Sequence, residues 1–256
     1  MFKLRRRNDT APTLAAEPPT ALSLDAVTRV HSTGTTALHD VTLRVPPGRF
    51  LAVMGRSGSG KSTLLQCAAG LDTVTSGTVR IGGTDLTALG ERELTRLRRD
   101  RVGFVFQSLN LVPSLSVLEN AALPLLLAGL PDDGRALSAL EAVGLADRAD
   151  DPPARLSGGQ CQRAAVARAL VTRPAVVFAD EPTAALDPDN AQTVLGLLRA
   201  AADRSGQAVV LVTHDPLAAE YADEVVFLDG GRIAGHSGMP RAGEIRQILS
   251  TLGATR

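Results

Sequence analysis

One glycine-rich segment has the residue types and the spacing of a phosphate-binding loop. It fits the pattern G-x-x-x-x-G-K-[ST] and, with the threonine that follows, comprises Gly55, Arg56, Ser57, Gly58, Ser59, Gly60, Lys61, Ser62 and Thr63. Glycines let the backbone curl so that its N–H groups point at phosphate oxygens. Lys61 can then reach the outer phosphates, and the Ser62 hydroxyl can ligate Mg²⁺. Because the only other lysine of the chain is Lys3, an ordinary Gly/Ser loop is a weak explanation, and the segment predicts a nucleotide site.

Two adjoining carboxylates form a second candidate group. They end the apolar run Val176–Glu181, and buried strands rarely finish in paired acids. Asp180 can hold Mg²⁺ through water, and Glu181 can orient or deprotonate an attacking water molecule. A solvated strand end terminated by Pro182 is the alternative, and the nearby phosphate loop makes that alternative improbable.

A second glycine motif opens a helix that runs to about Thr172. It consists of Leu156, Ser157, Gly158, Gly159 and Gln160. A serine hydroxyl and free N–H groups at a helix start could bind an anion, although a plain glycine-rich helix cap also fits. With the two groups above, this motif resembles the signature of the ABC ATPase family, and the resemblance extends from Leu22 to the end of the chain. It implies ATP as the nucleotide and a head-to-tail homodimer in which the signature of one subunit completes the ATP site of the other.

The resemblance assigns roles to three further residues, each of which also has a plainer explanation. Gln107 closes a strand and matches the Q-loop, which touches Mg²⁺ and faces the transmembrane partner; a strand-capping glutamine is the alternative. Asp187 matches the D-loop that crosses the dimer interface, and it can also cap a helix. His214 follows a buried strand and matches the switch histidine that senses the γ-phosphate. A lone histidine there would more often be structural.

Other segments narrow the resemblance to one branch of the family. The runs 103–113 and 123–127 look like the branch that exports lipoproteins, macrolides and antimicrobial peptides. The chain ends soon after its last predicted helix, which differs from sugar-importer ATPases with an extra C-terminal domain. Cys161 stands where relatives usually have glutamine. His31 stands where relatives usually have an aromatic residue that stacks on adenine, so we expect it to contact the base unless it is a solvent-facing loop residue.

Composition limits the possible partners. Lys+Arg 27 balance Asp+Glu 27 among 256 residues, so no strong field attracts nucleic acid. Aromatic residues make up 3%, too few for platforms that stack single-stranded bases. The basic start is not followed by an apolar run, and the run 121–130 is too short to span a bilayer. We therefore expect a cytoplasmic protein, peripheral on the inner face of the membrane through an integral-membrane permease.

The pattern of apolar residues predicts an α/β fold. Strands are expected over 22–27, 41–45, 50–54, 79–81, 102–106, 175–179 and 209–212, with a hairpin joining 225–228 to 232–234. Residues 1–20 are Arg-, Pro- and Ala-rich and predict a disordered tail. Residues 21–256 then form one nucleotide-binding domain with a P-loop NTPase core, a mainly parallel sheet and an N-terminal antiparallel β-subdomain. A helical subdomain is expected to be inserted at about 108–173.

The expected reaction is the hydrolysis of ATP to ADP and phosphate. In a transporter this reaction would drive the permease, with export as the expected direction. An ABC ATPase of DNA repair or translation is a rival, but such proteins usually carry coiled-coil insertions or two fused ATPase domains. A non-enzymatic ATP clamp is a second rival, and Glu181 and His214 argue against it. A third is an ATPase that transmits a signal through a membrane partner.

Overall fold

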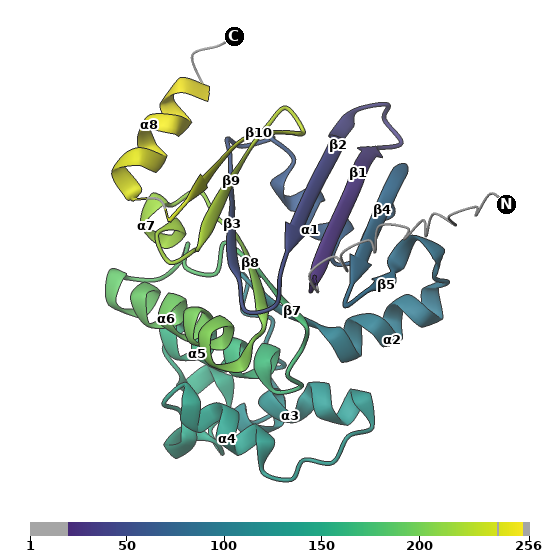
Figure 1. Ribbon diagram of the computed structural model, residues 1–256. Helices are drawn as coiled ribbons and strands as arrows, with labels where there is room; N and C mark the ends of the chain where they lie inside the picture. The colour runs from purple at the N-terminus through teal and green to yellow at the C-terminus, as the bar shows by residue number, and fades with distance from the viewer. Residues whose placement is uncertain (1–19, 240, 253–256) are drawn as a thin grey trace, which may run out of the picture.

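Two sheets and three groups of helices make up the part of the chain that the computed structural model describes, residues 20–239 and 241–252. A small antiparallel sheet lies beside a larger, mainly parallel sheet, and a group of helices hangs below the larger sheet in Figure 1. The predicted tail, except for Thr20, lies outside the described residues. None of the described helices combines the length and apolar character needed to cross a bilayer.

The larger sheet has six strands in the order β10-β9-β3-β8-β7-β6. Their bounds are β3 Phe50–Met54, β6 Val102–Phe106, β7 Val176–Asp180, β8 Ala208–Val212, β9 Glu224–Asp229 and β10 Arg232–Gly238. Neighbours are parallel except for the β9–β10 hairpin. Every residue of β3 and β8 is buried, as expected for parallel strands that helices cover on both faces. The predicted parallel core is therefore confirmed.

The smaller sheet has the strand order β2-β1-β4-β5 and is antiparallel throughout. Its strands are β1 Leu22–Val30, β2 Thr36–Val45, β4 Ser76–Ile81 and β5 Thr84–Asp85. The alternation predicted over 22–27 is interrupted, because Ala26 has a φ of 51° and the register shifts between Leu24 and Val27. This bulge lets Leu24 and Val27 both be buried although they are three positions apart.

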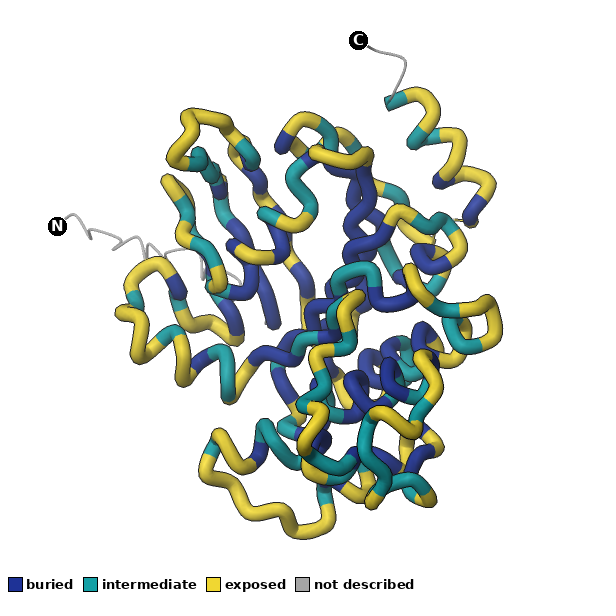
Figure 2. Tube along the Cα trace, turned by 180° about the vertical axis from the view of Figure 1, so that it is seen from behind, coloured by how far each residue is buried: buried dark blue, intermediate teal, exposed yellow. Residues whose placement is uncertain are grey.

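Helices cover both faces of the larger sheet. On one face α1 (Lys61–Ala68) and α2 (Glu91–Arg101) share an apolar core with the smaller sheet. On the other face α6 (Pro188–Ser205), α7 (Pro216–Ala219) and α8 (Ala242–Leu252) share a second core. Figure 2 shows the result, with buried strands at the centre and exposed residues along the loops and the outer turns of the helices.

Three helices pack around a third core of their own: α3 (Val117–Ala128), α4 (Arg135–Ala142) and α5 (Gly158–Leu170). Short 3₁₀ turns lie at Leu86–Ala88, Ala146–Arg148 and Pro153–Arg155. A capping box opens α3, since Ser116 and Glu119 exchange hydrogen bonds. Helix α5 also contacts β6 and α6, so it joins this helical lobe to the sheet.

Candidate functional site

Parallel pairing brings the predicted catalytic segments to one edge of the larger sheet. The register aligns Val53 with Val212, Val212 with Asp180, and Asp180 with Phe106. All four strands end at about this level, so the residues after them emerge side by side. These are the phosphate loop after β3, Thr213 and His214 after β8, Glu181 after β7 and Gln107 after β6. Ligands of α/β proteins bind at this carboxyl edge.

The phosphate loop is a close-packed backbone turn that opens α1. A Cβ on Gly55 would overlap the Leu228 carbonyl oxygen, and one on Gly60 would overlap the Ala37 carbonyl oxygen. Gly60 has a φ of 104°, which favours glycine, and it caps α1 without a side-chain hydrogen bond. The Ser59 hydroxyl is buried without a hydrogen-bond partner in the described part of the chain. A cavity of about 360 Å³ lies against residues 56–59 of the loop. Free N–H groups, an unpaired hydroxyl and open volume suit a bound phosphate chain.

Lys61 lies between the loop and the two acids. Its ammonium donates to the carbonyl oxygens of Gly55 and Arg56, each at 2.9 Å. Burial lowers the pKa of Lys61, and the charges of Glu181 and Asp180 oppose that shift. The interaction with both carboxylates indicates that the end of β7 faces the phosphate loop, as the predicted site requires.

The predicted metal ligands are all hard oxygen donors. Asp180 ends β7, Ser62 lies in the first turn of α1, and Gln107 directly follows β6. Burial, and then the adjacent charge of Glu181, raises the pKa of the Asp180 carboxyl, while Lys61 opposes the shift. A divalent cation would relieve this repulsion, and a carboxylate with a hydroxyl and an amide oxygen suits Mg²⁺. No group of three or more His, Cys, Asp or Glu residues forms an all-protein metal cage within residues 20–239 and 241–252.

Glu181 is held by two neighbours from the end of β8. His214 Nδ1 lies 2.7 Å from Glu181 Oε1, and the Thr213 hydroxyl donates to Glu181 Oε2 at 3.2 Å. The Glu181 backbone has a φ of 46°, and its N–H donates to the Val212 carbonyl oxygen. The structure therefore brings Glu181 and His214 together. Thr213 is fully buried and was not singled out by the sequence; a hydroxyl directly after the buried run 208–212 is the signal that could have found it.

A buried glutamine links the signature helix to the Q-loop strand. Gln162 lies on α5 and donates to the Phe106 carbonyl oxygen at 3.1 Å, directly before Gln107. The side-chain amide oxygen of Gln162, Oε1, is buried without a hydrogen-bond partner among the described residues. Gln107, Gln162 and Gly158 line one cavity of about 260 Å³, together with Pro182 and Leu186. The Q-loop, the signature helix and the segment after β7 thus meet within one chain, and Gln162 is a linking residue that the sequence motifs did not identify.

The signature lies outside the cavity at the phosphate loop. Ser157 caps α5 in a reciprocal pair with Gln160: each backbone N–H donates to the side-chain oxygen of the other residue. Ser157 and Gly158 are exposed. Neither residue lines the 360 Å³ cavity of its own chain. The structure therefore does not bring the signature and the phosphate loop together within one subunit.

The start of the signature helix packs against the start of α6. Asp187 caps α6 by accepting the Asn190 N–H at 3.0 Å, and it also accepts from the Asn190 side-chain amide at 2.6 Å. A Cβ on Gly159 would overlap that amide group. The predicted D-loop residue is therefore a helix cap, and Asn190 connects it to the signature motif.

His31 lies in the tight turn between β1 and β2. Its N–H donates to the Thr35 carbonyl oxygen at 2.9 Å. Two residues beyond this turn, Ala37 touches the phosphate loop at Gly60. The turn is thus close to the nucleotide site, and His31 is partly exposed there.

Comparisons with known proteins agree with this geometry. A model of the ABC transporter family matches residues 38–184. An uncharacterized ABC transporter ATP-binding protein of Mycobacterium tuberculosis is 46% identical over 199 residues, which are 77% of this chain and 80% of that protein. The bacitracin export protein BceA of Halalkalibacterium halodurans is 39% identical over 83% of this chain and 84% of its own length. The methionine import protein MetN of Rhizobium johnstonii is 46% identical over 78% of this chain, which spans 56% of that protein.

Solved structures give the same result. The dimeric ATP-binding cassette MJ0796 in a post-hydrolysis state with ADP and phosphate has a TM-score of 0.78 and 38% identity, over 86% of this chain and 99% of its own. The protein cbiO1 of Clostridium perfringens, part of the ABC transporter complex cbiONQ, has a TM-score of 0.81 and 28% identity, over 93% of this chain and 96% of its own. The chain belongs to the ABC transporter ATP-binding family and is an ABC-type ATPase that hydrolyses ATP.

Proposed function

We propose that this ATPase works as a Mg²⁺-dependent, head-to-tail homodimer that drives an integral-membrane permease. The observation that carries the catalytic part is the placement of Glu181. Its two carboxylate oxygens are held by His214 and Thr213 at the sheet edge that also holds the phosphate loop. A carboxylate fixed in this way can accept the proton of an attacking water.

Each residue at this edge has a chemical task in the proposal. Lys61 and the N–H groups of the loop stabilise negative charge on the phosphates. Glu181 orients the water and takes its proton, and His214 holds the carboxylate and reports on the outer phosphate. Asp180, Ser62 and Gln107 would hold Mg²⁺, which supplies charge neutralisation on the phosphate oxygens when bound.

Exposure of the signature supports the homodimer. Ser157 and Gly158 present a hydroxyl and the start of α5 to solvent, away from the phosphate loop of the same chain. An exposed helix start of this kind can bind an anion that another surface brings to it. The related cassette MJ0796 is dimeric, and a second copy of this chain would bring its own nucleotide.

An apolar groove near Gln107 suits the permease. Its walls come from α2, β6, α3 and α5 and enclose about 290 Å³. Leu127 lines the groove and is 64% exposed, and Leu126 beside it is 73% exposed. Adjacent exposed leucines mark interaction surfaces. The permease would hold the subunit on the inner, cytoplasmic face of the membrane.

Export is the proposed direction of transport. It rests on the resemblance of 103–113 and 123–127 to the exporter branch, and the likeness to BceA is consistent with it. The likeness to MetN shows that importers share much of the same sequence, so a transport assay in vesicles must decide the direction. The related signal-transmitting role through a membrane partner stays as the alternative.

Leu127→Asp tests the permease interface. A carboxylate in the apolar groove must be desolvated on docking, so we expect co-purification of the permease from membranes to be lost. The ATPase rate of the isolated subunit should stay within about twofold of the parent rate, because the groove lies outside the nucleotide site. Leu137→Asp is the matched control, since Leu137 is 41% exposed on α4 of the same lobe. Equal permease recovery with Leu127→Asp and parent would contradict the assignment.

A further inference from the structure

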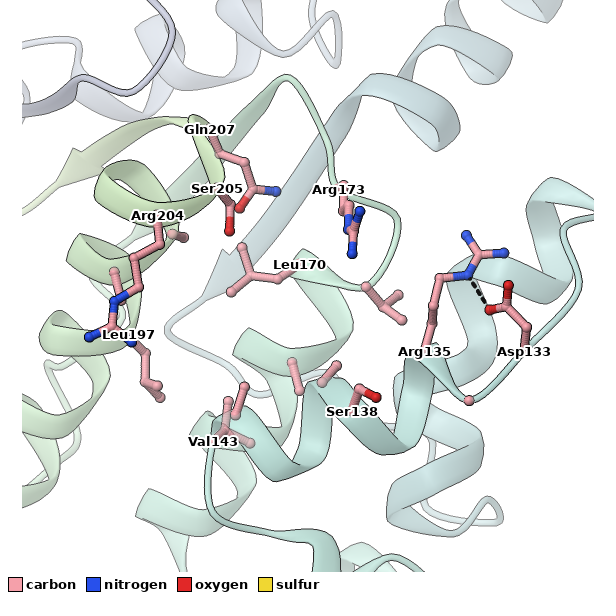
Figure 3. A pocket seen from close by; sticks show the side chains of 17 residues that line it. Asp133, Arg135, Ser138, Val143, Leu170, Arg173, Leu197, Arg204, Ser205 and Gln207 are labelled. Carbon is pink, nitrogen blue, oxygen red and sulfur yellow. Dashed lines mark hydrogen bonds and ion pairs between the residues drawn. The ribbon is translucent and has the colours of Figure 1, made fainter.

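We infer that a cavity between α4, α5 and α6 is a second ligand site, one that binds a small amphipathic organic anion. The cavity has a volume of about 490 Å³ and lies where the helical lobe meets the core of the domain. Its lining includes no residue of the phosphate loop, the signature or the end of β7. Figure 3 shows side chains from all three helices directed around one hollow. Occupancy would therefore be distinct from nucleotide binding.

The floor of the cavity is apolar. Leu170 of α5, Leu197 of α6 and Val143 after α4 line it, and alanines of the same three helices fill the spaces between them. Leu170 lies in the middle of the hollow in Figure 3. None of the described lining residues is aromatic, which disfavours a stacked nucleobase. The floor thus suits a short aliphatic chain, and the volume falls in the range of small-molecule sites.

The rim of the cavity is cationic. Three arginines and one aspartate line it, which gives a formal charge of plus two. Arg135 is already engaged, because its Nε donates to the Asp133 carboxylate at 2.7 Å. The guanidinium groups of Arg173 and Arg204 make no hydrogen bond or ion pair with another residue of the described ranges, although the charge of Arg173 helps to lower the pKa of Asp133. In Figure 3 the Arg173 guanidinium points into the hollow. Two arginines remain available to pair with an anionic head group.

The buried side-chain amide of Gln207 also points to a ligand in the cavity. Gln207 lines the cavity and is only 5% exposed. Its side-chain Nε2 is buried with no hydrogen-bond partner within residues 20–239 and 241–252. Leaving a buried donor unpaired destabilises the fold, so a retained amide at this position suggests an acceptor supplied from outside. In Figure 3 the Gln207 amide lies on the side of the hollow that faces Arg173.

These features select one class of ligand. An anionic head group would satisfy Arg173, Arg204 and Gln207, while an aliphatic chain would cover Leu170 and its neighbours. A neutral or cationic molecule of the same length would leave the guanidiniums unpaired. The head group can be a carboxylate or a phosphate monoester, since arginine binds both.

The test titrates the full chain by calorimetry with MgADP at saturation, so that the phosphate loop is filled. The probes are octanoate and octyl phosphate, compared with octanol and octylamine, all below their micelle-forming concentrations. We expect saturable binding of one or both anions and at least about tenfold weaker binding of the neutral and cationic probes. The tighter of the two anions identifies the head group.

Variants connect the binding to the cavity. Arg173→Gln and Arg204→Gln should each weaken binding of the anion at least about tenfold, because each removes one charged hydrogen-bond donor. Both side chains are exposed, so folding should be preserved. Arg96→Gln, an exposed arginine on α2, is the control and should bind as the parent does. The inference is overturned if neither anion binds saturably, or if both cavity variants bind the anion as tightly as Arg96→Gln does.

Discussion

At the scale of single residues, Glu181 is the proposed base, and Thr213 and His214 hold its carboxylate in place. Glu181→Gln keeps the shape of the side chain and removes the proton acceptor, so ATP turnover should fall by about 10² to 10⁴.

Thr213→Val keeps the shape of the buried threonine and removes its hydrogen bond to Glu181. Turnover should fall about tenfold with an unchanged KM, because the base remains but is less well oriented. Steady-state ATPase assays measure both effects.

A conservative variant separates positioning from a loss of structure. Thr213→Ser keeps the hydroxyl that Glu181 and the Asp215 N–H both use, and it should restore most of the turnover. If Thr213→Ser is as slow as Thr213→Val, the hydroxyl alone does not hold Glu181, and packing of the threonine methyl group matters as much as the hydrogen bond. A Glu181→Gln protein that turns over ATP at the parent rate would rule out this carboxylate as the base.

Asp180, the acid directly before Glu181, is expected to affect both the ATPase activity and the stability of the fold. Burial and the charge of Glu181 raise the pKa of Asp180, so the folded state binds its proton at a higher pH than the unfolded state does. Above that raised pKa the ionised carboxylate destabilises the fold, and the penalty disappears as the pH falls below it. Asp180→Asn should thus raise the Tm at neutral pH while abolishing Mg²⁺-dependent turnover.

Calorimetric melting with Mg²⁺ removed by a chelator measures this effect. The gain in Tm should be present at neutral pH and shrink on acidification, since the parent carboxyl then becomes neutral as well. A variant that is less stable than the parent at neutral pH would mean that the Asp180 charge supports the fold through Lys61.

Candidate site residues were predictable from the sequence where a motif gathers the reactive side chains on one short segment. The phosphate loop, Asp180 and Glu181 were proposed as site residues in this way, and the strands that precede them end at one edge of the larger sheet. Thr213 and Gln162 were not, because each acts on a segment distant in sequence, and the parallel register and the α5–β6 contact bring them there. The contacts themselves have no signal in a single sequence, although the place of Thr213 directly after the buried run 208–212 puts it at the end of a predicted strand.

At the scale of elements, strands were predictable because buried parallel strands are continuous apolar runs. The predicted runs 50–54 and 102–106 coincide with β3 and β6. Helix α2 was not predicted, because Glu91–Arg101 is mostly charged and only Leu97 is buried on it. The bulge at Ala26 was also missed, since it depends on where β1 must turn between its two neighbours.

At the close approach of α5 and α6, Gly159 lies against the side chain of Asn190. Gly159→Ala should displace the Asn190 amide, and with it the bond to Asp187, because a Cβ would overlap that amide. We expect the ATPase rate to fall about tenfold, with ATP binding to the monomer unchanged. The Asn190 amide is the end of a flexible side chain and can move aside, so the fold should lose little stability.

Gly196→Ala on α6 is the matched control for that substitution. Nothing lies within 4 Å of a Cβ at Gly196, and alanine favours the helix, so this variant should be active and slightly more stable. ATPase rates, calorimetric ATP affinities and melting curves of the two variants give the comparison. If Gly159→Ala hydrolyses ATP at the parent rate, catalysis does not need the contact between the signature motif and the segment of Asp187 and Asn190.

At the scale of the whole molecule, the proposed ATP site needs two copies of the chain. The exposed Ser157 and the phosphate loop lie apart in one subunit, and a head-to-tail partner would bring them together. Sequence alone reached this arrangement through resemblance to a family, because spacing within one chain carries no information about a second chain. The fold of the monomer was accessible from local patterns, whereas the proposed complete site needs a second copy of the chain.

A mixing experiment tests the head-to-tail site most directly. Lys61→Ala removes the phosphate-loop charge, Ser157→Arg blocks the signature, and each variant alone should be inactive. In a mixed head-to-tail dimer both defects fall in one site, and the other site has an intact loop and an intact signature. An equal mixture should therefore recover up to about one quarter of the parent ATPase rate, because half of the dimers are mixed and each has one working site. A mixture no more active than the two variants measured separately would show that the phosphate loop and the signature do not form a site shared between two subunits.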